Sequence, residues 1–288
     1  LLRAKQRGTN RYDFFNPGMG DASARHLAAE SALRRAIDNE ELVLYYQPQV
    51  SIKNEQIIGV EALIRWPDIH SGKMTQPSEF IPLAEETGLI IPLGEWILRT
   101  ACQQSIAWQE AGYPAIRVGV NISPIQFQES DIVQLVRDVL DETGLKPELL
   151  DLELTEGIIM GDQEATILIL QELNTMGVKL SIDDFGTGYS SLSYLKRFPV
   201  HMLKIDQSFI QGITSNADDL VITETISQLG KNLGLTIIAE GVENDAQLDV
   251  LRNQDCDLIQ GFLFSRAVSG EEIAALLKKQ MRRQSSLV

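Results

Sequence analysis

Short apolar segments alternate with longer amphipathic segments along most of the chain. The short segments have the pattern of β-strands, and we expect them at residues 42–46, 57–66, 116–120, 149–154, 178–182, 201–205, 235–239 and 258–259. Helical periodicity lies between most of them, at residues 77–86, 93–111, 129–141, 163–176, 217–233 and 244–252, and again at residues 271–281. Roughly eight strands that alternate with helices predict an α/β fold of the (β/α) barrel type, although a doubly wound sheet has the same local pattern.

The two ends of the chain depart from this regular pattern. Residues 1–15 carry several basic side chains and precede the turn-rich sequence Asn16-Pro17-Gly18-Met19-Gly20. Asp21 and Ser23 are candidate N-caps for a helix that follows this break. We therefore expect a main domain at residues 21–282, preceded by a tail and linker at residues 1–20 and followed by a C-terminal tail at residues 283–288.

The composition limits what the protein can bind. A length of 288 residues and a hydrophobic content of 44% suit one large globular domain. The formal net charge of -15 argues against electrostatic binding of a nucleic-acid polymer or an anionic membrane. An anionic substrate would therefore need cations between itself and the protein.

Cysteine usage and hydropathy indicate a reducing, aqueous environment. Cys102 and Cys256 fit the reduced thiols of a cytoplasmic protein, and three scattered histidines disfavour a zinc site. The chain contains no apolar run of membrane-spanning length and no signal peptide. Because it begins at Leu1 rather than Met, we expect a fragment whose full-length form could carry a membrane anchor upstream.

Two adjacent carboxylates and a glycine-rich turn follow one of the predicted strands. Asp183 and Asp184 come directly after residues 178–182, and Phe185-Gly186-Thr187-Gly188-Tyr189 continues the stretch toward Ser191. Neighbouring like charges repel unless protonation, hydrogen bonds or a cation relieves them. Taken alone, this stretch slightly favours a solvated turn or a helix N-cap, so the decision depends on the other strands.

Polar residues also follow most of the other predicted strands. In a (β/α) barrel the carboxyl ends of the strands open onto one face, where such residues would converge in one pocket. One strand-end carboxylate usually caps the next helix, but capping is a poor explanation for so many strands at once. The residues are Gln47, Glu61, Asn121, Glu153, Glu156, Asp183, Asp184, Lys204, Asp206, Glu240, Glu243 and Gln260.

A pocket of this composition predicts bound cations, because its carboxylates would repel one another strongly around a single lysine. Oxygen ligands without His or Cys select hard ions such as Mg²⁺ or Mn²⁺. Adjacent aspartates can place one carboxylate between two ions and the next on the outer ion, which indicates a pair of metals. In such pairs, roughly 3.5 to 4 Å apart, a bridging hydroxide attacks phosphorus while both ions stabilise the developing charge.

Several motifs together identify a family resemblance that extends from about Tyr45 to Leu277. The leading motif is Glu61-Ala62-Leu63-Ile64-Arg65-Trp66, and the supporting ones are Tyr46-Gln47-Pro48, Phe80-Ile81-Pro82-Leu83-Ala84-Glu85, Val120-Asn121-Ile122-Ser123, Glu153-Leu154-Thr155-Glu156, Asp183-Asp184-Phe185-Gly186-Thr187-Gly188, Leu203-Lys204-Ile205-Asp206, Ala239-Glu240-Gly241-Val242-Glu243 and Gln260-Gly261-Phe262. The chain resembles the EAL-domain cyclic di-GMP phosphodiesterases. The resemblance implies a modified TIM (β/α)8 barrel with the first strand antiparallel, and metal-dependent hydrolysis of cyclic di-GMP to linear 5'-pGpG by a water that two metal ions activate.

The resemblance also implies the roles of individual residues. It places Glu61, Asn121, Glu153 and Asp183 on one metal, with Asp183 bridging to a second metal held by Asp184 and Glu240. Lys204 would orient or deprotonate the attacking water, Glu156 would hold the loop after Asp184, and Glu243 would support the site. The substrate-binding residues would be Gln47, Glu61, Leu63, Arg65, Gln260 and Phe262.

Two of these substrate-binding roles have a physical reason of their own. The planar guanidinium of Arg65 suits a phosphate. Phe262 could stack on guanine, although an aromatic side chain in the core is an equally good reading of that position. The chain departs from the family pattern at Phe262, where a tyrosine is common, and at Ala267, where a proline is common.

The resemblance extends to partners of the domain. Residues 3–12 resemble the last stretch of a diguanylate cyclase (GGDEF) domain, so we expect the C-terminal part of a tandem GGDEF-EAL protein with upstream GGDEF or sensory domains. The family also implies a homodimer. We further expect inhibition by Ca²⁺, and no direct membrane contact by this fragment.

Two other functions use the same residues. One is a receptor of the same fold that binds cyclic di-GMP without cleaving it, and the complete ligand set argues for catalysis instead. The other is an unrelated metal-dependent barrel lyase or isomerase, which would share the carboxylates but not the remaining motifs.

Overall fold

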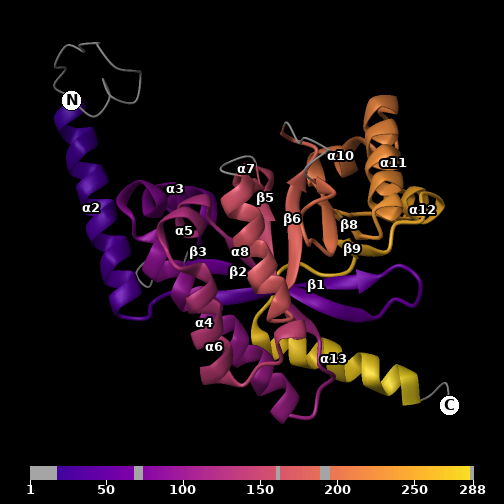
Figure 1. Ribbon diagram of the computed structural model, residues 1–288, viewed down its shortest axis with the longest axis horizontal. Helices are drawn as coiled ribbons and strands as arrows, with labels where there is room; N and C mark the ends of the chain where they lie inside the picture. Colours follow the sequence, from indigo (N-terminus) through magenta and orange to yellow (C-terminus); the bar gives the residue numbers. More distant parts are fainter. Residues whose placement is uncertain (1–17, 68–73, 160–162, 189–194, 286–288) are drawn as a thin grey trace.

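Eight strands form a closed barrel in the computed structural model, which describes residues 18–67, 74–159, 163–188 and 195–285 (Figure 1). They follow one another in the order β1-β9-β8-β7-β6-β5-β4-β2, and pairing of β1 with β2 closes the ring. Their bounds are β1 Val43–Ser51, β2 Ile57–Pro67, β4 Arg117–Ile122, β5 Leu150–Thr155, β6 Lys179–Phe185, β7 Met202–Ile205, β8 Thr236–Glu240 and β9 Leu258–Gln260. The predicted α/β barrel is confirmed.

The first strand runs against the others, as the family resemblance implied. β1 pairs antiparallel with both β2 and β9, whereas the pairs from β2 through β4 to β9 are parallel. A two-residue strand that the sequence did not predict, β3 at Met74–Thr75, pairs antiparallel with the end of β2.

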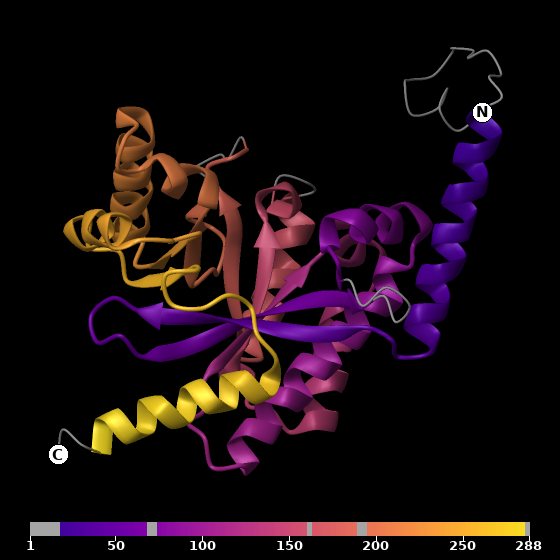
Figure 2. The ribbon, with the colours of Figure 1, turned by 180° about the vertical axis from the view of Figure 1, so that it is seen from behind.

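The helices surround the barrel and connect its strands (Figure 2). In both views the short helices α7 and α10, which follow strands, lie at one end of the barrel, and α13 lies at the opposite end. The helices are α2 Gly18–Asp38, α3 Pro77–Thr87, α4 Ile90–Glu110, α5 Pro124–Glu129, α6 Ile132–Thr143, α7 Glu156–Ile159, α8 Gln163–Thr175, α10 Gln207–Gly212, α11 Ala217–Asn232, α12 Asp245–Asn253 and α13 Gly270–Ser285, with a short 3-10 turn, η1, at Pro147–Leu149.

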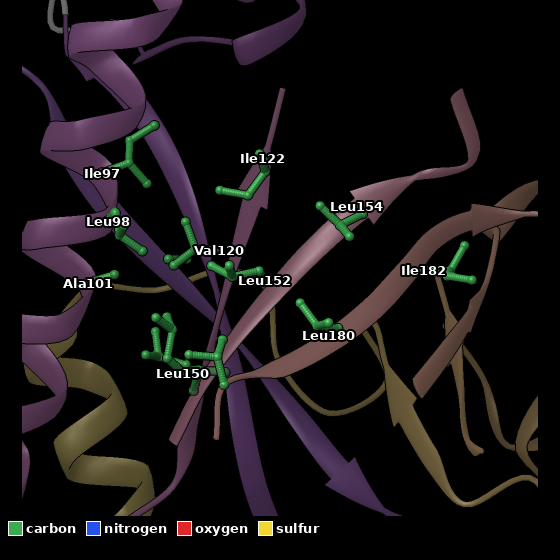
Figure 3. Packing of buried hydrophobic residues seen from close by; sticks show 14 of the residues in the cluster. Ile97, Leu98, Ala101, Val120, Ile122, Leu150, Leu152, Leu154, Leu180 and Ile182 are labelled. Carbon is green, nitrogen blue, oxygen red and sulfur yellow. The ribbon is translucent and has the colours of Figure 1, made fainter. Parts of the chain in front are cut away.

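The alternation of residues along each strand separates the hydrophobic core from the barrel interior. In β5 the apolar residues Leu150, Leu152 and Leu154 alternate with Asp151 and Glu153, and all five are buried. Successive side chains of a strand point to opposite faces, so the leucines pack outward against the helices. Figure 3 shows this layer, in which residues of α4 face the side chains of β4 and β5. In β5 the opposite face, toward the barrel interior, therefore carries the polar residues Asp151 and Glu153.

Each of the eight strands contributes one residue to a polar ring inside the barrel, which we call the upper ring. A second ring, the lower ring, lies two residues away along each strand on the same face. The upper ring consists of Gln47, Glu61, Asn121, Glu153, Asp183, Lys204, Glu240 and Gln260, and the lower ring of Gln49, Gly59, Gly119, Asp151, Ser181, Met202, Ile238 and Leu258. Met202, Ile238 and Leu258 pack as a hydrophobic cluster separate from the main core.

Several predicted boundaries were wrong. β1 continues through Pro48 to Ser51, so Gln47 lies within its strand and not after it. α2 already begins at Gly18, which puts Asp21 and Ser23 inside the helix and makes them no N-caps. α13 continues to Ser285, beyond the predicted end at residue 281 and into the expected tail. Residues 1–17, 189–194 and 286–288 lie outside the described part of the chain, and with them most of the GGDEF-like tail.

None of the helices in the described ranges combines the length and the apolar character needed to cross a membrane.

Candidate functional site

A cavity of about 520 Å³ opens above the upper ring. It lies at the carboxyl ends of the parallel strands, where barrel folds place their ligand sites. Ten of the predicted site residues line it: Gln47, Glu61, Leu63, Arg65, Asp183, Asp184, Glu240, Glu243, Gln260 and Phe262. Gln47 reaches this face because β1 is antiparallel and sets Gln47 opposite Glu61. Carboxylate, amide and guanidinium groups thus surround one opening.

Lys204 occupies the centre of the upper ring and is completely buried. Its Nζ lies 2.5 Å from Oε2 of Glu153, 2.7 Å from Oε1 of Glu240 and 3.0 Å from Oδ1 of Asp183. A fourth carboxylate, that of Glu61, has Oε2 at 3.6 Å. One ammonium group therefore faces four carboxylates, and the centre keeps an excess of negative charge.

Burial and the excess of negative charge shift the pKa values of Lys204 and of the carboxyl groups around it. Burial by itself would lower the pKa of Lys204, but Asp183, Glu153, Glu240 and Glu61 outweigh it and raise that pKa well above its ordinary value. Burial raises the pKa of Glu240 to about 8, against the opposing effect of Lys204. Burial also raises the pKa of Glu153 well above its usual range. Without further positive charge, the site therefore resists full ionisation of its carboxyl groups.

The carboxylates form two overlapping groups that could each hold a cation. Glu61, Glu153 and Asp183 each offer an oxygen within 4.8 Å of the others, and so do Asp183, Asp184 and Glu240. Asp183 belongs to both groups, which is the arrangement expected of a bridging ligand. Asn121 lies beside the first group, where its Nδ2 donates to Oε1 of Glu61 at 2.7 Å.

The end of β6 bends sharply at the pair of aspartates. Asp184 has a φ of 52°, a left-handed conformation that is strained for a residue other than glycine. Its N–H donates to Oδ1 of Asp183 at 3.0 Å, and the pairing of β6 with β7 shifts register there. Burial and the neighbouring charges of Asp183 and Asp206 raise the pKa of Asp184 to about 6. The bend turns the second carboxylate toward the cavity.

Glu156 contacts the glycine-rich turn from the start of α7. Its buried Oε2 accepts a hydrogen bond from the N–H of Gly188 at 3.0 Å. A Cβ atom at Gly188 would lie within 3.0 Å of that carboxylate, so this approach needs glycine. The contact agrees with the predicted role of Glu156, although residues 189–191 of the stretch lie outside the described residues.

Amide side chains hold the wall of the cavity near β1. Gln260 donates through Nε2 to Oε2 of Glu61 and, at 3.4 Å, to Oε1 of Gln47. Gln47 in turn donates through Nε2 to the carbonyl oxygen of Ser265 at 3.3 Å. This chain of contacts ties Glu61 to the turn after β9.

The turn after β9 presents an aromatic ring to the cavity. Phe262 is 49% exposed, which excludes the alternative that it fills the core. The guanidinium of Arg266 lies over its ring at 3.9 Å from the centroid. Arg65 lines the cavity from β2, and Glu243 is an exposed residue of the rim.

Six further residues line the wall. Gly241 and Gly261 lie within the quoted motifs, and Ala267 is one of the two departures from the family pattern, whereas sequence reasoning missed Gln76, Gln207 and Arg266 as site residues. Gln207 directly follows the motif Leu203-Lys204-Ile205-Asp206, and this position in the sequence could have identified it as a site residue. Gln76 precedes α3, and no pattern in the sequence connects it with the barrel. For Asp206 the capping explanation was right, because its carboxylate accepts from the N–H of Ser208 at the start of α10.

Comparison with known proteins agrees with these observations. Residues 30–267 match the family model described as the EAL domain. MucR of Pseudomonas aeruginosa, named a bifunctional diguanylate cyclase/cyclic di-GMP phosphodiesterase, is 44% identical over 275 residues, which are 96% of this chain and 40% of that protein. The signaling protein YkoW of Bacillus subtilis is 44% identical over 282 residues, which are 97% of this chain and 35% of that protein. The chain thus spans well under half the length of these curated relatives.

A solved structure described as the PaMucR phosphodiesterase in complex with c-di-GMP superposes with a TM-score of 0.82 at 45% identity. The match covers 85% of this chain and 99% of that one.

Proposed function

Because the chain belongs to the EAL-domain family, we propose that it is a metal-dependent phosphodiesterase that hydrolyses cyclic di-GMP to linear 5'-pGpG. The observation that carries the proposal is that two clusters of three carboxylates lie at the base of the cavity and have Asp183 in common. MucR and the cyclic di-GMP phosphodiesterase NbdA of Pseudomonas aeruginosa, the latter 40% identical over 92% of this chain, support the same substrate.

The residues present suit two hard divalent cations, and the family is metal-dependent. Glu61, Asn121, Glu153 and Asp183 would hold one ion, and Asp183, Asp184 and Glu240 the other. All of these ligands are oxygens, which favours Mg²⁺ or Mn²⁺. Bound there, the ions would offset the excess negative charge and stabilise the charge that develops on the phosphodiester.

Lys204 would handle the proton of the attacking water. While four carboxylates face its Nζ, the amine stays protonated and its three N–H groups donate to them. An N–H released by a carboxylate that binds a cation would orient the water. Neutralisation of those carboxylates would remove the cause of the raised pKa and let Nζ accept a proton instead.

The walls of the cavity suit a nucleotide. Arg65 would pair with a phosphate through its planar guanidinium, and Phe262 would stack on a guanine. Gln47, Glu61, Leu63 and Gln260 would contact the rest of the substrate. Glu156 would fix the turn after Asp184, and Glu243 would support the rim.

The context of the domain is proposed on the same basis. The MucR name combines a diguanylate cyclase with a phosphodiesterase, which supports a tandem parent in which residues 21–282 form the phosphodiesterase domain. We propose that this domain acts in the cytoplasm as a homodimer.

The test is to incubate the metal-free protein with cyclic di-GMP, with and without Mg²⁺ or Mn²⁺, and to follow pGpG by chromatography. Turnover that requires the ion is expected. Binding of cyclic di-GMP without any turnover under either ion would contradict the proposal and leave a receptor. Absence of both binding and turnover would point to a different substrate.

A further inference from the structure

Gln49 lies in the lower ring, directly beneath the carboxylates of the site. It is 1% exposed, and its Nε2 lies 3.4 Å from Oε1 of Glu153. The antiparallel direction of β1 allows this contact, because Gln47 then reaches the upper ring while Gln49 reaches Glu153 from below. None of the motifs that identify the family includes Gln49.

Two glycines leave the room that this pair occupies. A Cβ atom at Gly119 would lie 2.1 Å from Oε1 of Glu153, and one at Gly59 would lie 2.8 Å from Oε1 of Gln49. Both values are below the closest approach that real Cβ atoms show, so any larger residue would push one of the two side chains aside. The neighbouring strands β2 and β4 therefore carry glycine where the amide and the carboxylate meet.

The two oxygens of Glu153 have different partners. Lys204 holds Oε2 at 2.5 Å, on the side where Glu61 and Asp183 also approach Nζ. Oε1 points toward Gln49. We propose that Gln49 is a positioning residue that sets the rotation of the Glu153 carboxylate, so that Oε2 faces the cation site shared with Glu61 and Asp183. The inference rests on the proposed function of that site.

A neutral donor is the suitable partner for this position. A carboxylate oxygen buried without a hydrogen bond is costly, so Oε1 needs a donor. A cationic donor would cancel part of the negative charge that attracts the metal ions. The amide of Gln49 supplies the hydrogen bond and leaves the charge of the site unchanged.

The test compares Gln49→Met, which keeps the shape of the side chain but loses the donor, with the wild-type protein. The first readout is the affinity of metal-free protein for Mn²⁺, titrated without substrate by electron paramagnetic resonance. Residues that orient metal ligands typically change affinity or activity by about 10- to 100-fold, and a loss in that range is expected. In turnover, kcat should fall with little change in KM, because the affected group touches the ion and not the nucleotide.

A second variant separates orientation from packing. Gln49→Leu also removes the amide but fills the space with a different apolar shape. Equal losses of Mn²⁺ affinity in Gln49→Leu and Gln49→Met are expected and would assign the effect to the missing donor, whereas clearly unequal losses would assign it to packing and count against the inference. The control is Gln280→Met, which removes another amide, one that hydrogen-bonds the N–H and the carbonyl oxygen of Ile57 from α13 at the opposite end of the barrel. It should lower thermal stability while leaving Mn²⁺ affinity unchanged.

Wild-type Mn²⁺ affinity and kcat in folded Gln49→Met protein would overturn the inference. If that variant does not fold, Gly59→Ala perturbs the same amide from the β2 side and replaces it in the comparison. A wild-type protein that binds Mn²⁺ but does not cleave cyclic di-GMP would refute the proposed function alone. The Mn²⁺ affinities of wild-type and Gln49→Met protein would still test the role of Gln49.

Discussion

Oδ1 of Asp183 lies 3.0 Å from Nζ of Lys204, and Asp183 is also the carboxylate common to both groups that could hold a cation. One side chain therefore connects the proton-handling lysine with both proposed ions. Its backbone supports this position, because the N–H of Asp184 donates to the same oxygen from within the strained end of β6. Loss of the Asp183 carboxylate should therefore affect both proposed cation sites and the contact with Lys204 at once.

We predict that Asp183→Asn lowers turnover by several orders of magnitude, because it removes one negative charge from both proposed cation sites. Glu153→Gln should behave similarly, because it removes a charge from one site. The measurement is pGpG formation at saturating Mg²⁺, beside cyclic di-GMP affinity, which we expect to persist. Asp249→Asn, an exposed change on α12, is the control. Near wild-type activity in Asp183→Asn would show that the metal assignment is wrong.

We predict that Gly119→Ala impairs the site more than the fold. The added Cβ would overlap Oε1 of Glu153, a side chain that can shift, so the carboxylate should turn away from Lys204. Activity should fall by at least tenfold, of the order found when ligand-orienting residues are changed. Gly157→Ala is a matched control, because among the described residues, its own chain neighbours aside, the added Cβ would meet only the Thr155 hydroxyl, at 3.8 Å. Equal activity of the two variants would argue against this steric explanation.

The sequence predicted the eight strands and the residues of the upper ring for a common physical reason. Alternation such as Leu150-Asp151-Leu152-Glu153-Leu154 records which face of a strand meets the helices. The same pattern says nothing about strand direction, so the antiparallel β1 came from family resemblance. Gln49 was missed because the predicted strand ended at residue 46 whereas β1 continues to Ser51, and Gln76 because it lies outside the barrel strands, where no periodic signal points to the cavity.

We predict that both cysteines of the folded protein are unreactive. Burial raises the pKa of Cys102 and of Cys256 to about 12, so neither forms the reactive thiolate at neutral pH. Since these values exceed the ordinary pKa of about 8.5, the stability they confer is fully present below that pH and is lost as the pH rises toward 12. Labelling with Ellman's reagent at about pH 8 should be far slower in native than in urea-unfolded protein. Rapid labelling of the native protein would refute this prediction.

We predict that the domain forms a homodimer. The family resemblance places a self-association surface on the helix and loop after Asp184, part of which, residues 189–194, lies outside the described residues. Sedimentation equilibrium over a range of protein concentrations checks it, with activity measured in the same samples. A fully active monomer at high micromolar concentration would exclude dimerisation as a condition of activity.

We predict that Ca²⁺ binds the site but supports little or no hydrolysis. The proposed ligands are oxygens, which Ca²⁺ accepts, and the negative charge around Lys204 attracts any divalent ion. Ca²⁺ prefers ligand distances of about 2.3 to 2.6 Å with 6 to 8 neighbours, whereas Mg²⁺ requires near-octahedral geometry at about 2.0 to 2.1 Å. The carboxylates that meet within a few ångströms at Asp183 would have to spread to accommodate the larger ion. That movement would displace the attacking group from its line to phosphorus.

The measurement is cyclic di-GMP affinity and pGpG formation in parallel, with Mg²⁺, Mn²⁺ or Ca²⁺ as the sole divalent ion added to metal-free protein. Substrate affinity in Ca²⁺ should approach that in Mg²⁺ while turnover falls to a small fraction. Addition of Ca²⁺ to the Mg²⁺-loaded protein should inhibit, since the two ions compete for the same carboxylates. Equal rates in Ca²⁺ and Mg²⁺ would show that hydrolysis does not depend on the ligand geometry around Asp183, and would count against a mechanism with two metal ions.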